Sequence, residues 1–206
     1  MNSFSPTAII GQGWSIFRDR WVDYYKATIV VIFVAFATSY GGGIVEEVLG
    51  SFPAALYRFF TFYVNSVLAI GYMRVYLQIV RDEPLELDVL YKHYKDWGLI
   101  FTFVGTQIIY TFVGFLGLLL LIIPGIYFLL KYLFVQLLVA DQGLSIGEAF
   151  KKSAKMTEGI KIKLIVYALL TFSLGILGLL LLLVGSLVTG PVVSLSGGVL
   201  YDRLRK

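Results

Sequence analysis

The chain has 206 residues and a formal net charge of +4, and 58% of its residues are apolar, 16% aromatic and 15% charged. With a mean hydropathy of +0.83, this composition lies outside the range of soluble proteins and predicts one integral membrane domain over residues 1–206. The absence of cysteine excludes disulfides, thiolate metal ligands and cysteine nucleophiles.

The N-terminal segment is predicted to be an amphipathic helix that lies on the membrane surface. Ser5 and Pro6 suit a helix cap and the first helical position. Aromatic residues favour the headgroup layer of a bilayer, so they support an interfacial position. The large apolar side chains recur at helical spacing, at Ile10, Trp14, Phe17 and Trp21.

Two membrane spans are predicted to follow this helix. Residues 27–45 form an uncharged stretch of 19 residues, which is long enough to cross the hydrocarbon core. The return span is shorter, because only residues 59–73 are free of charge. Arg58 and Arg74 can extend their apolar stems and place their charges at opposite membrane surfaces. Asn65 is therefore expected near mid-depth.

The central part of the chain predicts a second helical hairpin. Residues 99–130 contain 32 residues without a charge, and one helix of that length would reach about 48 Å and exceed a hydrocarbon core of about 30 Å. Pro124 favours the first turn of a new helix, so we expect spans at residues 97–122 and 124–140. A second short amphipathic helix is predicted before them, on the face of Leu87, Leu90, Tyr91 and Tyr94.

A third amphipathic helix is predicted over residues 144–157, and a third hairpin follows it. Ser145 and Glu148 have the spacing of a capping box, in which each side chain satisfies a free amide at the helix start. Residues 164–200 are uncharged for 37 residues, which is again too long for one crossing. We expect this hairpin to turn between residues 185 and 191.

These elements together predict an all-α polytopic membrane protein with six transmembrane helices in three hairpins, each preceded by a cytoplasmic amphipathic interfacial helix. The repeat units would be residues 1–83, 84–142 and 143–206. Residues 116–121 and 177–182 are similar at an offset of 61, and Asp141 and Asp202 keep that offset. Leucine-rich spans also resemble one another by composition alone, so true threefold repetition stays open.

The distribution of basic residues predicts the orientation in the membrane. If both termini are cytoplasmic, fifteen of the seventeen Lys and Arg residues lie on that side, which leaves Arg58 outside and Lys131 within a span. The opposite orientation would place those fifteen outside. We therefore predict a multi-pass protein of the cytoplasmic (inner) cell membrane with cytoplasmic N- and C-termini. Topology also accounts for the net positive charge, so no nucleic-acid partner is expected.

One part of the chain resembles a known group of proteins. The resemblance is carried by the segments Leu120 to Tyr127, Ala140-Asp141, Glu148 to Ser153 and Thr157-Glu158-Gly159, together with Lys131 and Ser145. This combination is similar to a widespread group of uncharacterised prokaryotic six-helix integral membrane proteins, which includes the membrane domain fused to some glycerophosphodiester phosphodiesterases. The similarity is strongest over residues 116–163. It implies a fold and a membrane location rather than an activity.

No sequence motif indicates catalysis. The chain has no P-loop, zinc-binding spacing, dinucleotide-binding turn or nucleophile elbow. Its carboxylates fall in predicted loops, interfacial helices or span ends, which argues against a proton relay across the bilayer. We therefore predict no catalytic residues, metal site or cofactor, and a protein that is not an enzyme. His93, the single histidine, is predicted to be a solvated surface residue.

Two sets of residues are candidates for binding. Asn65, Gln107 and Lys131 lie near the middle of their predicted spans and can form a polar mid-membrane site; hydrogen bonds between helices and a lysine that extends to the membrane surface are the alternative readings. Five lysines are candidates for contact with anionic lipid headgroups, each worth about 1 kcal/mol, or else they only set the topology. These are Lys151, Lys152, Lys155, Lys161 and Lys163.

The predicted function is non-enzymatic. We expect an integral membrane protein that binds lipids or amphiphiles at the cytoplasmic leaflet or supports membrane organisation, with membrane lipids and a protein partner or homo-oligomer as its partners. The alternative is a small transporter or channel whose polar pathway runs near mid-membrane. That alternative requires a continuous cavity that reaches Asn65, Gln107 and Lys131.

Overall fold

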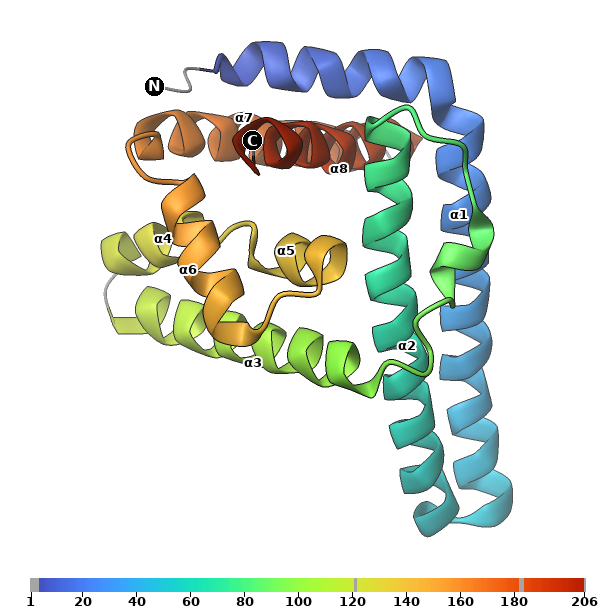
Figure 1. The fold of residues 1–206 in the computed structure, drawn as a ribbon. Coiled ribbons are helices and arrows are strands. Elements are labelled where there is room, and N and C mark those ends of the chain that lie inside the picture. The colour runs from blue at the N-terminus through green and yellow to red at the C-terminus, as the bar shows by residue number, and fades with distance from the viewer. Residues whose placement is uncertain (1–3, 121, 182–183, 206) are drawn as a thin grey trace.

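The computed structural model describes residues 4–120, 122–181 and 184–205. Within these residues the secondary structure consists of helices joined by short connections, and there is no strand. The elements are α1 (Pro6–Leu49), α2 (Ser51–Val80), the 3₁₀ helix η1 (Leu87–Leu90), α3 (Trp97–Leu120), α4 (Ile122–Lys131), α5 (Val135–Gln142), α6 (Ile146–Met156), α7 (Lys161–Leu180) and α8 (Val184–Arg205) (Figure 1). Six segments are long and apolar enough to cross a membrane, and α4 and α5 together form one of them. The prediction of an all-α fold with six such helices is confirmed.

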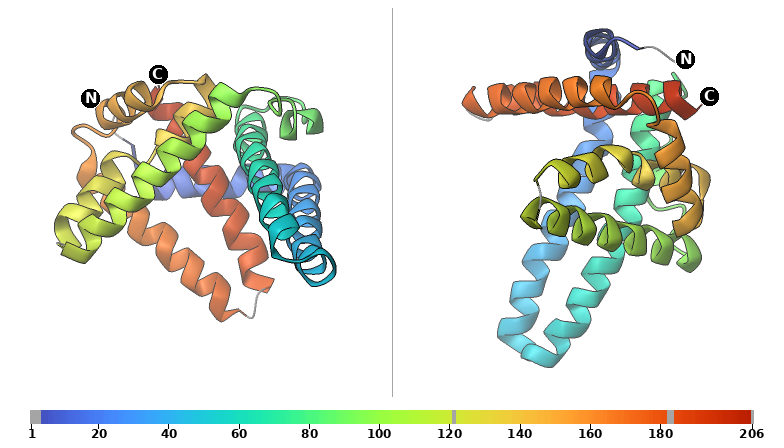
Figure 2. Two further views of the ribbon diagram at one scale, coloured as in Figure 1. Left: turned by 90° about the horizontal axis from the view of Figure 1, so that it is seen from below. Right: turned by 90° about the vertical axis from the view of Figure 1, so that its left-hand side faces the viewer.

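The long helices lie in three pairs that point in different directions. α1 packs along α2, α3 along α4, and α7 along α8. The α1–α2 pair runs across the direction of the other two pairs (Figure 1), and the α3–α4 and α7–α8 pairs are inclined to each other when seen from below (Figure 2, left). Gly50, with φ at 86°, joins α1 to α2 in a backbone conformation that favours glycine. Gly117 and Gly125 lie where α3 and α4 touch: a Cβ on Gly117 would come within 2.9 Å of the Gly125 Cα.

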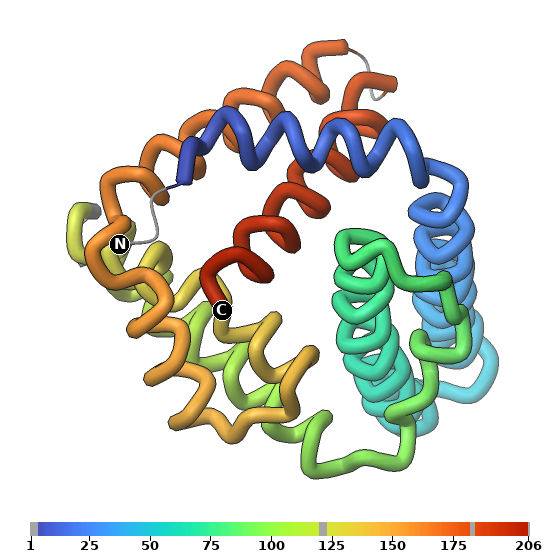
Figure 3. The backbone as a smooth tube through the Cα atoms, turned by 45° about the horizontal axis from the view of Figure 1, so that its top comes forward, coloured from blue at the N-terminus to red at the C-terminus, as the bar shows by residue number. Residues whose placement is uncertain are grey.

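The first helix combines the predicted interfacial helix and the predicted first span. α1 bends at Arg20, whose φ and ψ are −128° and 28°. Before the bend it lies across α7 and α8, and after the bend it runs along α2 (Figures 1 and 3). Arg20 stabilises the bend by hydrogen bonds to the Asp23 carboxylate at 2.9 Å and to the Glu83 carbonyl at 2.8 Å. The glycines at 41–43 remain inside the helix.

The span predicted over residues 124–140 corresponds to the candidate span Ile123–Gln142, but its helix is interrupted between α4 and α5. A break leaves backbone groups without helical partners, which is tolerated at membrane depth only where other groups satisfy them. Two hydroxyl groups at the C-terminal end of α6 do this, those of Ser153 and of the capping residue Thr157. Ser153 Oγ accepts from the Phe134 amide at 3.3 Å and donates to the Lys131 carbonyl at 3.2 Å, and Thr157 Oγ1 donates to the same carbonyl at 3.0 Å.

The turn predicted between residues 185 and 191 is wrong. α7 ends at Leu180 and α8 begins at Val184, so Pro191 lies inside α8. A proline within a helix lacks the amide that would bond to the carbonyl four residues earlier, here that of Leu187. The Tyr25 hydroxyl of α1 donates to this Leu187 carbonyl. The side chain of a distant helix therefore compensates for the proline, and α8 continues.

The short amphipathic helix predicted before α3 is a four-residue 3₁₀ helix followed by turns. Isolated short helices are unstable, so tertiary contacts determine the conformation of such a segment. Leu90 is buried against α2 at Gly71, where an added Cβ would lie 2.4 Å from the Leu90 Cα. Tyr91 and Tyr94, on the same predicted face, are exposed.

The buried core lies where the three helix pairs meet. Its largest cluster surrounds α5, in which Val135, Leu138 and Val139 are fully buried, and includes Phe134 and Tyr201. The outer parts of the pairs expose large apolar side chains, which is typical of helix surfaces in contact with lipid. Examples of exposed residues are Phe33, Phe36, Phe59, Phe101 and Phe172.

Candidate functional site

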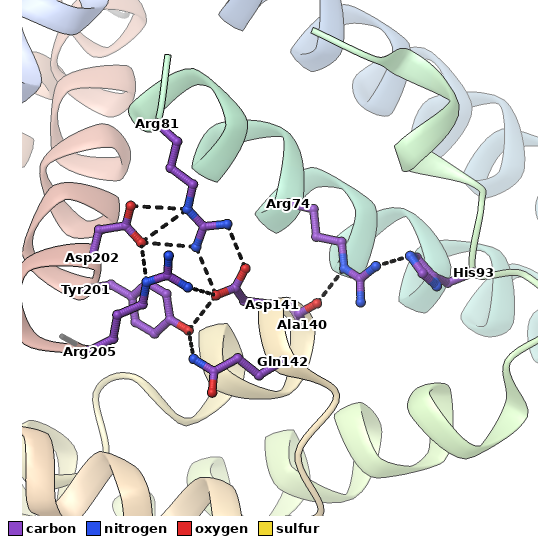
Figure 4. Close-up of polar contacts among 9 residues, drawn as sticks. All are labelled: Arg74, Arg81, His93, Ala140, Asp141, Gln142, Tyr201, Asp202 and Arg205. Carbon is purple, nitrogen blue, oxygen red and sulfur yellow. Dashed lines mark hydrogen bonds and ion pairs between the residues drawn. The ribbon is translucent and has the colours of Figure 1, made fainter. Parts of the chain in front are cut away.

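Four charged residues gather where the ends of α2, α5 and α8 meet. Arg81 caps the end of α2, Asp141 lies in the last turn of α5, and Asp202 and Arg205 lie one turn apart near the end of α8 (Figure 4). We call these four residues the charge cluster. Their side chains are between 9% and 31% exposed, so the cluster is largely removed from solvent.

Arg81 occupies the centre of the charge cluster. Its two terminal nitrogens donate to the two Asp141 oxygens, each at 2.9 Å, in the bidentate arrangement that makes arginine–carboxylate pairs strong. The same guanidinium donates to Asp202 at 3.0–3.2 Å. Arg205 then pairs with both carboxylates, at 3.0 Å each. Two positive and two negative charges therefore balance within one hydrogen-bonded group.

The neighbouring carboxylates keep Arg81 charged. Partial burial opposes its charge, but the hydrogen bonds that Arg81 donates to Asp141 and Asp202 outweigh that effect and raise the pKa of Arg81 above its ordinary value. Both aspartates are engaged by arginine, so neither is free to act as a base or ligand while the cluster is intact. The cluster can join the ends of three helices, one from each predicted repeat unit.

A chain of neutral polar groups extends the charge cluster toward α6. The Tyr201 hydroxyl donates to Asp141 at 2.8 Å and accepts from the Gln142 side-chain amide at 3.0 Å. Lys152 of α6 donates to the Gln142 carbonyl oxygen at 2.6 Å. One of the lysines predicted to contact headgroups therefore connects α6 with the site.

The prediction that His93 is a solvated surface residue is wrong. Its ring contacts the Arg74 guanidinium of α2, and Arg74 also donates to the Ala140 carbonyl at the end of α5 (Figure 4). Burial and the adjacent Arg74 charge lower the pKa of His93. Asp96 raises this pKa and Lys92 lowers it, and the net shift is downward. The imidazole is therefore expected to be neutral and to accept a hydrogen bond from Arg74.

Acidification is expected to weaken the fold through His93. Because the folded pKa lies below the unfolded value of about 6.5, the unfolded chain takes up a proton first as the pH falls. Stability should be constant above that pH, fall below it, and level off below the folded pKa. Thermal unfolding of the purified protein at pH 7.5 and 5.5 should show a decrease that His93→Gln reduces. An unchanged decrease in His93→Gln would assign the pH dependence to other groups.

The three residues predicted to share a mid-membrane site lie in separate surroundings. Asn65 lines a cavity between α1 and α2. Gln107 is exposed and donates to Thr111 of its own helix at 3.0 Å. The Lys131 ammonium lies 5.3 Å from the centre of the Tyr132 ring, at the end of α4. The structure does not bring these three side chains together.

The other predicted headgroup lysines lie on α6 and at the start of α7. Lys151 and Lys155 are exposed, and Lys163 is partly buried. The Lys161 ammonium donates to the Tyr127 hydroxyl of α4 and lies 4.1 Å from the centre of that ring. Of these lysines, Lys161 and Lys163 lie in the first turn of α7.

Two adjoining cavities follow the α7–α8 pair. The larger, of about 740 Å³, is lined by apolar, glycine and hydroxyl side chains of both helices, among them Gly175 and Gly190. The smaller, of about 300 Å³, is lined also by Tyr76 of α2 and Tyr167 of α7. Both include Thr171 among their lining residues, so they adjoin. We call the two together the α7–α8 groove.

The charge cluster was missed from the sequence. Its one sequence signal is the repeat spacing, because Asp141 and Asp202 end the second and third predicted units and Arg81 lies sixty residues before Asp141. Within the described residues, no group of three His, Asp or Glu side chains is close enough to hold a metal ion. Comparisons with protein-family models, curated protein sequences and solved structures found no match to the chain.

Proposed function

We propose that this chain is a protein of the cytoplasmic membrane, with both termini in the cytoplasm, that binds a membrane lipid or related amphiphile from the cytoplasmic leaflet in the α7–α8 groove. The observation that carries the proposal is the continuity of the groove. Its volumes of about 740 and 300 Å³ fall in the range of small-molecule sites, which combine apolar walls with a few polar groups.

The chemistry along α7 supports an amphiphile. Lys163 precedes Tyr167 by one helical turn and Thr171 by two, so a positive charge, a phenol and a hydroxyl follow one another along one face. The groove beyond them is mainly apolar and is lined by residues such as Ile176 and Leu179. A phospholipid whose phosphate lies near the lysines and whose alkyl chain runs along α7 matches this order.

Separation of the polar residues argues against a transport pathway. A channel of the kind considered from the sequence needs Asn65, Gln107 and Lys131 around one cavity, and they lie in three different surroundings. The α7–α8 groove instead offers a binding site beside the lipid-facing surface. Binding without chemistry is therefore the function that the geometry supports best.

Filling the groove should abolish lipid binding without disturbing the fold. An added Cβ at Gly175 or Gly190 meets no atom within 4 Å, so leucine at either position can project into the groove, and leucine also favours helix more than glycine. We expect Gly175→Leu and Gly190→Leu to weaken binding of an anionic phospholipid to the delipidated protein at least tenfold, or about 1.4 kcal/mol. Native mass spectrometry can measure this loss.

Gly11→Leu is the matched control, because Gly11 also has open space around its Cβ position but lies in the first part of α1 and lines neither cavity of the groove. It should leave binding unchanged. Full lipid binding in both groove variants, with unaltered thermal stability, would show that the groove is not the site. Equal affinity of the unmodified protein for anionic and neutral phospholipids would contradict the role of the lysines.

A further inference from the structure

A second cavity lies at the opposite end of the molecule from the charge cluster, between α1 and α2 near Gly50. Its volume is about 500 Å³, and polar side chains from both helices line it. The Gly50 end of this pair extends well beyond the other helices (Figure 1). This cavity is therefore separate from the α7–α8 groove and from the function proposed above.

An ion pair marks the outer end of this cavity. Arg58 of α2 donates through one terminal nitrogen to one oxygen of Glu46 of α1, and their side chains are 68% and 49% exposed. A guanidinium has five N–H donors and a carboxylate has two oxygens. Arg58 therefore has further N–H donors, and Glu46 has a second oxygen, for a ligand that carries both a negative and a positive charge.

Two polar side chains, those of Ser39 and Asn65, line the cavity about two helical turns from the ion pair. Neither Ser39 of α1 nor Asn65 of α2 forms a side-chain hydrogen bond within the part of the chain that the structure describes. Asn65 lies seven residues from Arg58, or about 10 Å along the helix. A polar group that faces hydrocarbon without a partner is costly. Ser39 is exposed and Asn65 is partly buried, so both side chains can bond to a polar group of a ligand at that depth.

We propose that this cavity binds a zwitterionic phospholipid with a primary ammonium group, taken from the leaflet at the Gly50 end. Arg58 binds the phosphate, Glu46 accepts from the ammonium, and Asn65 and Ser39 bond to the ester groups. The charged residues lie at the outer end of the cavity and Asn65 lies deeper, which is also the order of the charged headgroup and the ester groups in a phospholipid. The headgroup layer is about 5–7 Å thick on each side of a bilayer. Glu46 opposes a lipid with net negative charge.

The discriminating experiment exchanges Glu46 for glutamine. In a Gly175→Leu background, in which the α7–α8 groove is filled, native mass spectrometry should show that phosphatidylethanolamine binds about tenfold more tightly than phosphatidylglycerol. Glu46→Gln leaves Arg58 without its carboxylate partner and should reverse this preference, whereas Arg58→Gln should weaken both lipids. Glu47→Gln is the matched control, because it removes the same charge from the adjacent residue, which does not line the cavity.

Two results would overturn the proposal. The first is an equal effect of Glu46→Gln and Glu47→Gln on lipid preference, which would show that the net charge of this region, and not the cavity, determines the preference. The second is a dimer of the purified protein that Asn65→Leu dissociates, since a second copy would then supply the partner of Asn65. The groove variants Gly175→Leu and Gly190→Leu test the α7–α8 groove, whereas the Glu46 and Arg58 variants test this cavity, so either proposal can fail without the other. Variants are compared only when their thermal midpoints match that of the unmodified protein.

Discussion

Replacing Arg81 with methionine is expected to lower the free energy of unfolding by about 2–4 kcal/mol. Arg81 is 19% exposed and holds Asp141 and Asp202 from two other helices, and its loss leaves two carboxylates against Arg205 alone. Removing one partner of a buried ion pair typically costs about 3–5 kcal/mol because a charge stays buried without compensation, and partial exposure reduces that cost. Thermal unfolding in detergent should show a midpoint lower by roughly 5–15 °C.

Removing the charges in matched pairs should restore much of this stability. Arg81→Met combined with Asp141→Leu leaves Asp202 and Arg205, which already pair at 3.0 Å, so no net charge remains in the cluster. The exposed pair of Arg18 and Asp19 provides the control, since Arg18→Met should change the midpoint little. If Arg81→Met were as mild as Arg18→Met, the charge cluster would not hold the three helix ends together.

Hydropathy and helix length were sufficient to predict the six apolar helices. These features depend on stretches such as residues 164–200, which are uncharged and too long for one crossing. The capping box was also predicted correctly, because it depends on residues three positions apart: the Ser145 amide donates to the Glu148 carboxylate at 3.0 Å. The Ser145 hydroxyl donates to the same carboxylate at 2.6 Å, and this bond together with that of the amide lowers the pKa of Glu148.

The parts of the fold that the sequence did not predict depend on distant partners. Pro191 suggested a turn because a proline removes a helical hydrogen bond, but Tyr25, 166 residues earlier in the chain, satisfies the free carbonyl of Leu187. His93 looked like a surface residue because its sequence neighbours are polar, and only the fold places Arg74 beside it. Local patterns identify helices, whereas long-range hydrogen bonds determine where those helices break.

The candidate site shows the same limit. Lys131 drew attention as a charge within a predicted span, and its side chain was expected to meet Asn65 and Gln107. Instead, its backbone carbonyl is the group with long-range partners, since it accepts hydrogen bonds from Ser153 and Thr157. A lysine at the end of α4 also interacts favourably with the negative end of the helix dipole. The position of Lys131 therefore follows from the helix break.

Removing both hydroxyls at the C-terminal end of α6 that satisfy this break is expected to be among the most damaging changes in the protein. Ser153 and Thr157 are fully buried, and Ser153→Ala with Thr157→Val leaves the Lys131 carbonyl and the Phe134 amide without side-chain partners. Each unsatisfied buried group costs about 1–3 kcal/mol, so the double variant should lose about 2–5 kcal/mol. Thermal unfolding measures the loss, and faster hydrogen exchange at the Phe134 amide would locate it at the break.

Lys131→Met separates the backbone from the side chain at this position. It keeps the carbonyl and removes the ammonium, whose contact with the Tyr132 ring at 5.3 Å is worth about 0.5–1 kcal/mol. Its effect should therefore be several times smaller than that of the double variant, and lipid binding in the α7–α8 groove should be unchanged. A larger loss of stability in Lys131→Met would mean that the lysine charge, rather than the two hydroxyls, supports the break. The membrane-depth break between α4 and α5 would then depend on an ionic partner instead of on α6.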